Sequence, residues 1–246
     1  MIFEIFGTDA HSMTKSLMTA GDVAKRIPKD ANIALKPNLV RAGSPETGAT
    51  THPGVLSGCI EYLQENGFSN ISIIESSWIG GNTQQSFKTC GYDKVCQKYN
   101  VPFYDLKADK VKRVDTPLRP MEISQRALDA DFLIDLPVLK GHSQTRITCA
   151  LKNLKGCIPD HEKRRFHAEG LFKPIAALAS ALTPDLVIVD SICYKCFAAY
   201  VPAFIMALRY SSLTISGLKF LQLRLVSSIF KVSFISIPPR CVIKSV

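Results

Sequence analysis

Short apolar runs alternate with longer segments of mixed polarity along the first 190 residues of this chain. The runs are continuously apolar rather than alternately apolar and polar, which is typical of strands buried on both faces of a parallel sheet. The pattern predicts six strands, at residues 2–6, 32–35, 71–74, 101–104, 132–136 and 186–189.

The segments between these runs have the length and the end signals of helices. The second helix illustrates this, because Thr51 or His52 can cap its start at Pro53, and Asn66-Gly67 is a good C-terminal signal. The predicted helices run from Ser12 or Thr14 to before Pro28, from 53 to 66, and over about 86–98, 122–129 and 174–182. Strands that alternate with helices predict an α/β fold: a mostly parallel sheet with helices on both faces.

Charged side chains stand at or near the ends of five predicted strands, namely Lys36, Glu75, Asp105, Asp135 and Asp190. Ligands of open α/β sheets bind outside the carboxyl ends of the strands. We therefore predict a site there for an anionic ligand or a metal. Each residue taken alone is also explained by a strand that leaves the core.

Charge is unevenly distributed along the 246 residues. Residues 1–190 carry 23 of the 30 Lys and Arg and all 21 Asp and Glu, whereas residues 191–246 carry the other seven basic residues and no acid. The net charge of +9 is therefore mainly a property of the tail. The nearly balanced body gives no electrostatic case for binding nucleic acid.

The tail, residues 191–246, has no clear helix or strand period. Its longest uncharged run, residues 197–208, is too short to span a bilayer. A membrane-surface anchor, a β-rich basic module and translation out of frame after about residue 191 are the competing interpretations. We favour the third, because the pattern breaks abruptly after a well-formed strand. We thus expect an α/β domain at 1–190, incomplete at its C-terminal side, and an atypical tail at 191–246.

The eight cysteines are scattered at positions 59, 90, 96, 149, 157, 193, 196 and 241. This spacing is neither that of a disulfide scaffold nor that of an iron–sulfur motif. The N-terminus lacks the features of a secretory signal. We expect reduced cysteines, no transmembrane span and a cytoplasmic location.

Residues 137–167 hold the densest set of chemically active side chains. Lys140-Gly-His142 follows a buried strand and suits binding of a carboxylate or phosphate, with His142 as acid or base. Lys152 and Asn153 follow Thr145 and Thr148 at helical spacing, which predicts a polar helix face. The alternative is a solvated helix face.

Two further segments carry candidate ligand residues. Lys36-Pro-Asn38 begins a loop that ends at Thr51-His52, where a helix start can cradle an anion, although an ordinary connecting loop with a Thr cap explains it better. His161 and His167 lie six apart, unlike metal-binding pairs four apart on a helix. The basic run at residues 163–165 favours an anion, with His167 as a second acid or base.

Six motifs in order resemble the family of domain of unknown function 362 over about residues 30–190. They are KPNL at 36–39, ATTHP at 49–53, PVLKGH at 137–142, LKNLKG at 151–156, Phe166-His167, and PDL to Asp190 from 184. The resemblance implies an α/β fold without a settled activity, and it implies an association with 4Fe–4S ferredoxin-like segments. This chain lacks a cluster-binding cysteine motif, and its tail does not match the family.

The sequence leaves three functions open, and it does not decide whether the protein is an enzyme. The first is binding of an anionic small molecule or a metal by Lys36, Asn38, Thr51, His52, Lys140, Lys152 and Asn153, with proton transfer by His142 or His167. The second is docking of a ferredoxin-type electron carrier by the same basic residues. The third is attachment to a membrane surface through the basic, apolar tail.

Overall fold

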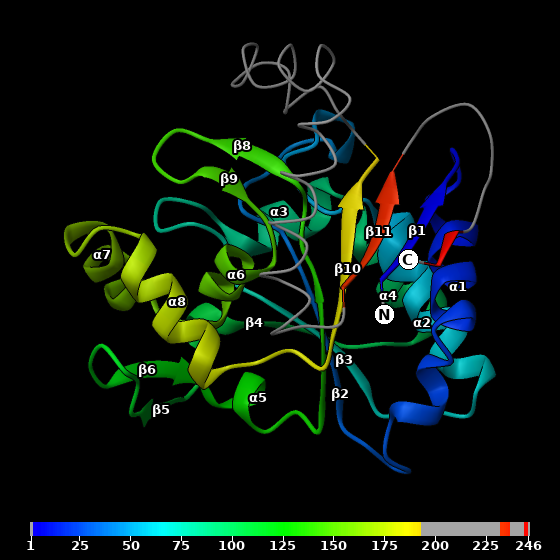
Figure 1. The fold of residues 1–246 in the computed structure, drawn as a ribbon, viewed down its shortest axis with the longest axis horizontal. Coiled ribbons are helices and arrows are strands. Elements are labelled where there is room, and N and C mark those ends of the chain that lie inside the picture. Colours follow the sequence, from blue (N-terminus) through cyan, green and yellow to red (C-terminus); the bar gives the residue numbers. More distant parts are fainter. Residues whose placement is uncertain (1, 193–231, 237–243, 246) are drawn as a thin grey trace.

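The computed structural model describes residues 2–192, 232–236 and 244–245 (Figure 1). Five parallel strands form the centre of the sheet, in the order β4 (Phe103–Asp105), β3 (Ile71–Glu75), β2 (Ile33–Pro37), β7 (Phe132–Leu136) and β10 (Leu186–Ser191). Beyond β10 lie β11 (Val232–Ser236) and β1 (Phe3–Phe6), also parallel, and the antiparallel β12 (Lys244–Ser245). The predicted α/β class and the mostly parallel sheet are confirmed.

Helices cover both faces of this sheet (Figure 1). One face carries α1 (Ala10–Ala20), α2 (Pro53–Glu65), α3 (Thr83–Thr89) and α4 (Tyr92–Tyr99). The other carries α5 (Gln125–Leu128), α6 (Ala150–Asn153), α7 (Asp160–Ala168) and α8 (Phe172–Ala181). Single 3₁₀ turns occur at η1 (Val23–Arg26), η2 (Pro45–Thr47), η3 (Leu106–Ala108) and η4 (Leu154–Cys157).

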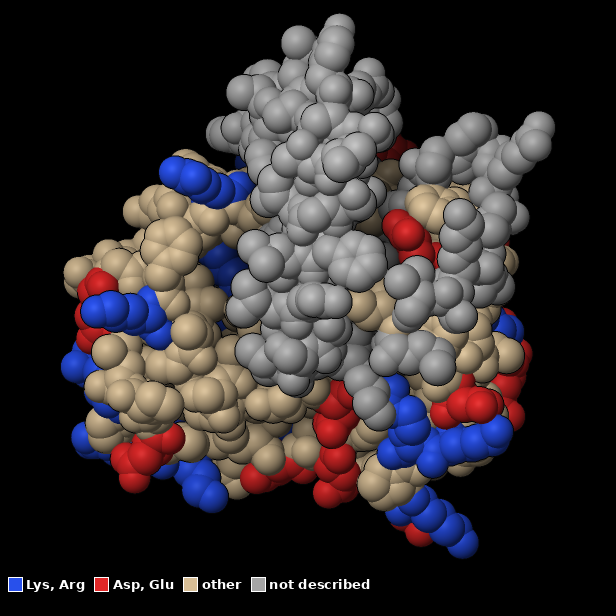
Figure 2. All heavy atoms as spheres, in the orientation of Figure 1, with Lys and Arg blue, Asp and Glu red and all other residues tan. Residues whose placement is uncertain are grey.

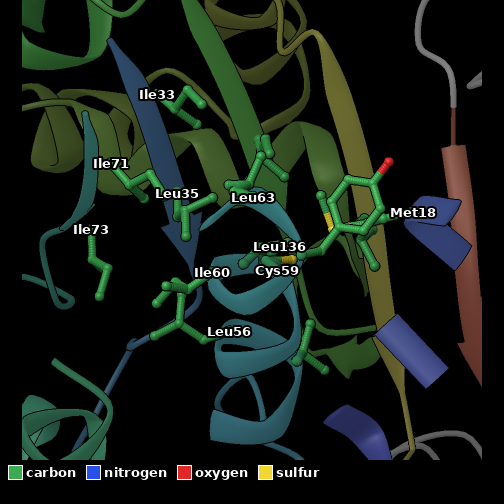
Figure 3. Packing of buried hydrophobic residues seen from close by; sticks show 14 of the residues in the cluster. Met18, Ile33, Leu35, Leu56, Cys59, Ile60, Leu63, Ile71, Ile73 and Leu136 are labelled. Carbon is green, nitrogen blue, oxygen red and sulfur yellow. The ribbon is translucent and has the colours of Figure 1, made fainter. Parts of the chain in front are cut away.

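The side chains of each central strand divide between two hydrophobic cores, because neighbours along a strand point to opposite faces. In β2, Ile33 and Leu35 join the core under α1 and α2, whereas Ala34 joins the core under α6 and α8. Figure 3 shows the first core, where Leu56, Ile60 and other α2 side chains meet the apolar side chains of β2, β3 and β7. Burial on both faces explains why these strands are continuously apolar.

Two antiparallel hairpins were not predicted. One joins β5 (Val111–Val114) to β6 (Met121–Ser124), and the other joins β8 (Lys140–His142) to β9 (Arg146–Thr148). The predicted helix over 122–129 is therefore wrong in its first half: Met121 and Ile123 are buried at a spacing of two, and only residues 125–128 are helical. The helical spacing read from Thr145 to Asn153 is likewise wrong before Ala150, where α6 begins.

The helix predicted over 86–98 is divided into α3 and α4. Gly91, between them, has a φ of 77°, in the left-handed region that glycine adopts most readily. The first predicted helix is too long, because α1 ends at Ala20 and the separate 3₁₀ turn η1 follows it before Pro28. The remaining predicted helices and all six strands are present, with ends shifted by a few residues.

Most of the tail, at residues 193–231, 237–243 and 246, lies outside the described residues, and Cys193, Cys196 and Cys241 lie there too. The out-of-frame interpretation therefore stays a prediction. Among the described helices, none combines the length and the apolarity needed to cross a membrane. On the face shown in Figure 2, acidic and basic side chains are interspersed over the described part of the chain.

Candidate functional site

A cavity of about 500 Å³ lies beyond the carboxyl ends of β2, β3 and β7. In the sheet, β3 and β4 follow β2 on one side, and β7 and β10 follow it on the other. The chain thus reverses direction across the sheet between β2 and β7, and ligands of open α/β sheets bind at such points. The lining residues come from the loops after β2 and β3, the β8–β9 hairpin, α6, η4 and α7.

The cavity is cationic. Among the described residues that line it, five are basic and one is acidic: Arg41, Lys140, Lys152, Lys155 and Lys163 against Glu75. The carboxylate of Glu75 is already paired, because Nζ of the fully buried Lys36 lies 2.6 Å from its Oε2. The lining therefore carries an excess of positive charge, which attracts an anion.

The Lys36–Glu75 ion pair forms part of the wall beneath the cavity. Lys36 also donates to the carbonyl of Pro37 at 2.8 Å, and Oε2 of Glu75 accepts from the backbone N–H of Leu39. Gly156 lies directly against this pair, since a Cβ there would come within 1.8 Å of a Glu75 carboxylate oxygen. The LKNLKG motif thus requires glycine at position 156, because the Glu75 carboxylate lies too close to its backbone for any side chain.

A directed chain of hydrogen bonds runs from the cavity into the core. Nζ of Lys140 donates to Oδ1 of Asn38 at 3.1 Å, Nδ2 of Asn38 donates to Oδ1 of Asn153 at 2.8 Å, and Nδ2 of Asn153 donates to Oδ1 of Asp135 at 2.7 Å. Lys140 also donates to the carbonyl of Ala49. The chain fixes the orientation of both amides in the wall of the cavity.

Asp135, at the end of this chain, is fully buried in β7. Burial raises the pKa of its carboxyl to about 7, although Lys36 and the Asn153 hydrogen bond act in the opposite direction. Its Oδ2 has no hydrogen-bond partner among the described residues. A proton held on this carboxyl near neutral pH is the physical consequence.

His142 lies on β8 and lines the cavity. Its Nδ1 accepts from the backbone N–H groups of Gln144 and Thr145, both at 3.2 Å, so the proton of the neutral ring is on Nε2. Burial, followed by the charge of Lys152 and neighbouring cations, lowers the pKa of His142 to about 4. The ring therefore stays neutral at physiological pH.

Lys152 and Lys155 are held as crowded cations in the same wall. Burial lowers the pKa of each ammonium to about 8, helped by Lys140 for Lys152 and by Lys152 and Lys163 for Lys155. Lys152 makes no hydrogen bond or ion pair to any described residue, whereas Nζ of Lys155 lies 3.3 Å from Nε2 of His167. Burial and the two lysines also lower the pKa of His167.

Lys163 closes the side of the cavity that faces β3. Its Nζ donates to Oγ of Ser76 at 2.7 Å and to the carbonyl of Ser77 at 2.8 Å, and it lies 3.2 Å from Oδ1 of Asp160. Burial lowers its pKa. These bonds tie α7 to the segment that follows β3.

Six of the nine predicted site residues line the cavity: Asn38, Lys140, His142, Lys152, Asn153 and His167. Lys36 lies beneath it. Thr51 does not line it, because its hydroxyl donates to the carbonyl of Leu136 and accepts from the N–H of Asn38. His52 caps α2 through Nδ1, which accepts from Gly54.

Two of the charged residues at strand ends also lie away from the cavity lining. Asp190 accepts from the backbone N–H groups of His52 and Ile192, and Asp105 caps η3. Their carboxylates therefore accept hydrogen bonds from nearby backbone N–H groups. This agrees with the alternative given above, in which a charged residue stands where a strand leaves the core.

The segment after β3, Ser76-Ser77-Trp78, contributes to the lining and was not predicted as part of the site. Arg41 was missed as well. The sequence held one indication that this segment belongs to the site: Ser76 directly follows a buried strand that ends in Glu75. Within the described part of the chain, no group of three or more His, Cys, Asp or Glu is placed to hold a metal.

The chain is similar to known proteins in sequence. A family described as "Domain of unknown function (DUF362)" matches residues 33–199. The thylakoid-associated protein sll1697 of Synechocystis sp. is 28% identical over 194 residues, and the match covers 75% of this chain and 60% of that protein. The chain thus spans about 60% of the length of this curated relative.

It is also similar to a solved structure in fold. The lactate racemase apoprotein from Thermoanaerobacterium thermosaccharolyticum superposes with a TM-score of 0.53 at 14% sequence identity. The superposition covers 80% of this chain and 52% of that one. At this identity the likeness concerns the α/β fold alone.

Proposed function

Because the chain belongs to the DUF362 family, whose description assigns no activity, we propose its function from the cavity: the protein binds a small molecule that carries a carboxylate or phosphate group. The excess of lysine over carboxylate in the lining is the observation that supports this proposal most strongly. Lys152 is the central cation, since its ammonium has no counter-ion among the described residues.

The polar groups around Lys152 suit the same ligand. His142 offers an N–H without a positive charge, which is the form that polarises a carbonyl or stabilises an oxyanion. His167 shares its Nε2 with Lys155, so a proton can pass between the two bases. In this proposal His142 donates a hydrogen bond, and the His167–Lys155 pair accepts or returns a proton at the ligand.

Replacement of Lys152 by methionine tests the proposal. The variant keeps the length of the apolar stem and removes the charge, so we expect the affinity for inorganic phosphate to fall about 10- to 100-fold, the equivalent of a hydrogen bond to a charged group. Isothermal titration calorimetry measures the change. Lys173→Met, which removes an exposed charge on α8 outside the cavity, is the matched control and should bind as the wild type does. Equal binding by both variants would contradict the proposal.

The iron–sulfur association implied by the family resemblance remains a separate proposal. Docking of an acidic ferredoxin on the cavity mouth would use the same lysines, but it would be weakened by salt and would not need small-anion binding. The ultraviolet–visible absorbance of anaerobically purified protein and its salt-dependent association with ferredoxin distinguish this role from the binding of a small ligand.

A membrane-surface role is favoured by two observations: the relative in Synechocystis sp. is named for its association with thylakoids, and the tail is basic and acid-free. Each Lys or Arg near an anionic bilayer contributes about 1 kcal/mol of attraction. The full chain should then float with anionic vesicles at low salt and be released at high salt, and it should not float with neutral vesicles.

A further inference from the structure

Trp78 is an exposed aromatic ring at the edge of the cationic cavity. It follows β3 by three residues, lines the cavity, and leaves 56% of its surface exposed. Large apolar side chains of this exposure are few among the described residues, and the others are Val111, Leu118 and Phe172, none of which lines the cavity. A core-packing role therefore does not account for this side chain.

The backbone of the Trp78 segment is fixed from both sides. The N–H of Trp78 donates to the carbonyl of Val40 at 3.1 Å. Nζ of Lys107 donates to the carbonyls of Trp78 and Gly81, at 3.0 and 2.8 Å. The side chain is exposed, but the segment that carries it is anchored to the loop after β2 and to η3.

Two glycines support the indole ring. A Cβ at Gly80 would come within 2.6 Å of the six-membered ring, and a Cβ at Gly81 would come within 2.6 Å of the five-membered ring. The ring therefore lies against the bare backbone of the Gly80–Gly81 turn. This support leaves the rest of the ring open to the cavity and to solvent.

The surroundings of the ring combine apolar and cationic groups. Val40 and Ile79 line the cavity beside Trp78, and the lysines and His142 line it elsewhere. A flat aromatic group gains by stacking on such a ring, and the volume of about 500 Å³ is in the range of sites for small organic ligands. A bare inorganic anion would use the lysines and leave Trp78 without a role.

We propose that the ligand carries an aromatic or heteroaromatic ring next to its carboxylate or phosphate, and that this ring stacks on Trp78. The inference rests on the anion binding proposed above and adds the class of molecule. The lysines hold the anionic end, and the indole selects the flat group.

Probes that differ only in the attached group test this inference. Calorimetry would compare phenyl phosphate, butyl phosphate and inorganic phosphate, with benzoate and acetate as the carboxylate pair. We expect phenyl phosphate to bind the wild type at least about fivefold more tightly than either other phosphate, the equivalent of about 1 kcal/mol. Trp78 is the only tryptophan in the sequence, so a change in intrinsic fluorescence on binding reports directly from this position.

Trp78→Ala should abolish the preference for phenyl phosphate over inorganic phosphate, while Trp78→Phe should keep part of the preference. Gly80→Ala should weaken the preference with the indole still present, because its Cβ displaces the ring, and Gly43→Ala, whose Cβ meets nothing within 4 Å, should not.

The two proposals fail in different ways. If all three phosphates bind the wild type equally, or if Trp78→Ala weakens them all to the same extent, the stacking inference is wrong and anion binding stands. If no phosphate or carboxylate binds the wild type, both proposals are wrong.

Discussion

Individual side chains in this protein carry charge in two different settings. Two ion pairs compensate charges that are buried or nearly so: Lys36 with Glu75, and Arg119 with Glu162 at 2.7 Å. In the cavity, Lys152 has no counter-ion among the described residues, and burial, followed by the charge of Lys140, lowers its pKa. A buried charge without a partner lowers the stability of a fold. A protein that retains such a charge either uses it to bind a ligand or is less stable because of it.

The carboxyl of Asp135 should make the stability of the fold depend on pH. Its pKa in the folded chain is about 7, whereas an exposed aspartate titrates near 3.9. The fold favours the protonated form, so the stability contributed by this proton is fully present below about pH 4 and is lost as the pH rises through about 7. Urea denaturation at several pH values measures this loss, about 1.4 kcal/mol for each unit by which the pKa is raised.

Asp135→Asn is neutral at every pH and is the comparison for this prediction. The difference in unfolding free energy between variant and wild type should move in favour of the variant from pH 4 to pH 7. A difference that stays constant over this range would show that Asp135 is not the titrating group.

Residue types predicted the cationic wall of the cavity better than they predicted its apolar edge. Lys140, His142 and Lys152 were predicted because the residue type alone indicates that lysine can bind an anion and histidine can transfer a proton. Trp78 was missed because an aromatic residue is more often buried, and only the fold shows that the turn at Gly80 leaves the ring exposed. Thr51 and His52 were placed at the correct helix start, but the sequence does not show that backbone groups already use their side chains.

Elements buried on both faces were the most predictable, because a continuous apolar run of four to six residues leaves few alternatives. The strands β3, β7 and β10 illustrate this. The hairpins were not predictable in the same way. β8 and β9 have three residues each and are at most half buried apart from Thr148, so no apolar pattern marks them. Their fold is set by tertiary contacts.

The contact between α1 and α2 depends on a glycine. A Cβ at Gly58 of α2 would lie 2.5 Å from the carbonyl oxygen of His11 and 2.9 Å from Cβ of Thr14, both on α1. Alanine has the higher helix propensity by about 1 kcal/mol, but overpacking costs about 1–3 kcal/mol. We expect Gly58→Ala to lower the unfolding free energy in urea denaturation.

Gly43→Ala is the matched control for this substitution, because the same methyl group meets open space there. That variant should unfold at the wild-type urea concentration or slightly above it. A Gly58→Ala protein as stable as the wild type would mean that the two helices separate without cost.

At the scale of the whole molecule, the order of strands in the sheet determines where the cavity lies. The chain segments after β2 and β7 both line the cavity, where the side chain of Lys140 donates to that of Asn38. The sequence predicted that the strand ends share an edge, because parallel strands require it. It did not predict which strand ends flank the cavity, because the local pattern of apolar and polar residues does not determine the order of strands in the sheet. Asp105 and Asp190 were grouped with the site for that reason.

The affinity of the cavity for an anion should fall at alkaline pH. Lys152 and Lys155 have pKa values of about 8, so both are charged below that pH and lose their charge as the pH rises above it. Each lysine that must be protonated for binding contributes a decrease of up to tenfold per pH unit. His142, neutral down to about pH 4, contributes no change near pH 6 or 7.

Calorimetric titration with sulfate from pH 6 to pH 10 at constant ionic strength measures this profile. The affinity of Lys152→Met should be lower at neutral pH and should decline less steeply above pH 8. A sulfate affinity independent of pH in the wild type would contradict the role of these two lysines.

The hydrogen bonds from Lys140 through Asn38 and Asn153 to Asp135 have a definite polarity. An amide has one oxygen and one NH₂, so Asp135, the last acceptor in the series, dictates the orientation of the two amides that precede it. A donor in place of Asp135 would turn both amides over, and Asn38 would then present its NH₂ to the ammonium of Lys140. A substitution in the hydrophobic interior can in this way repel a cation at the surface of the cavity without moving the backbone.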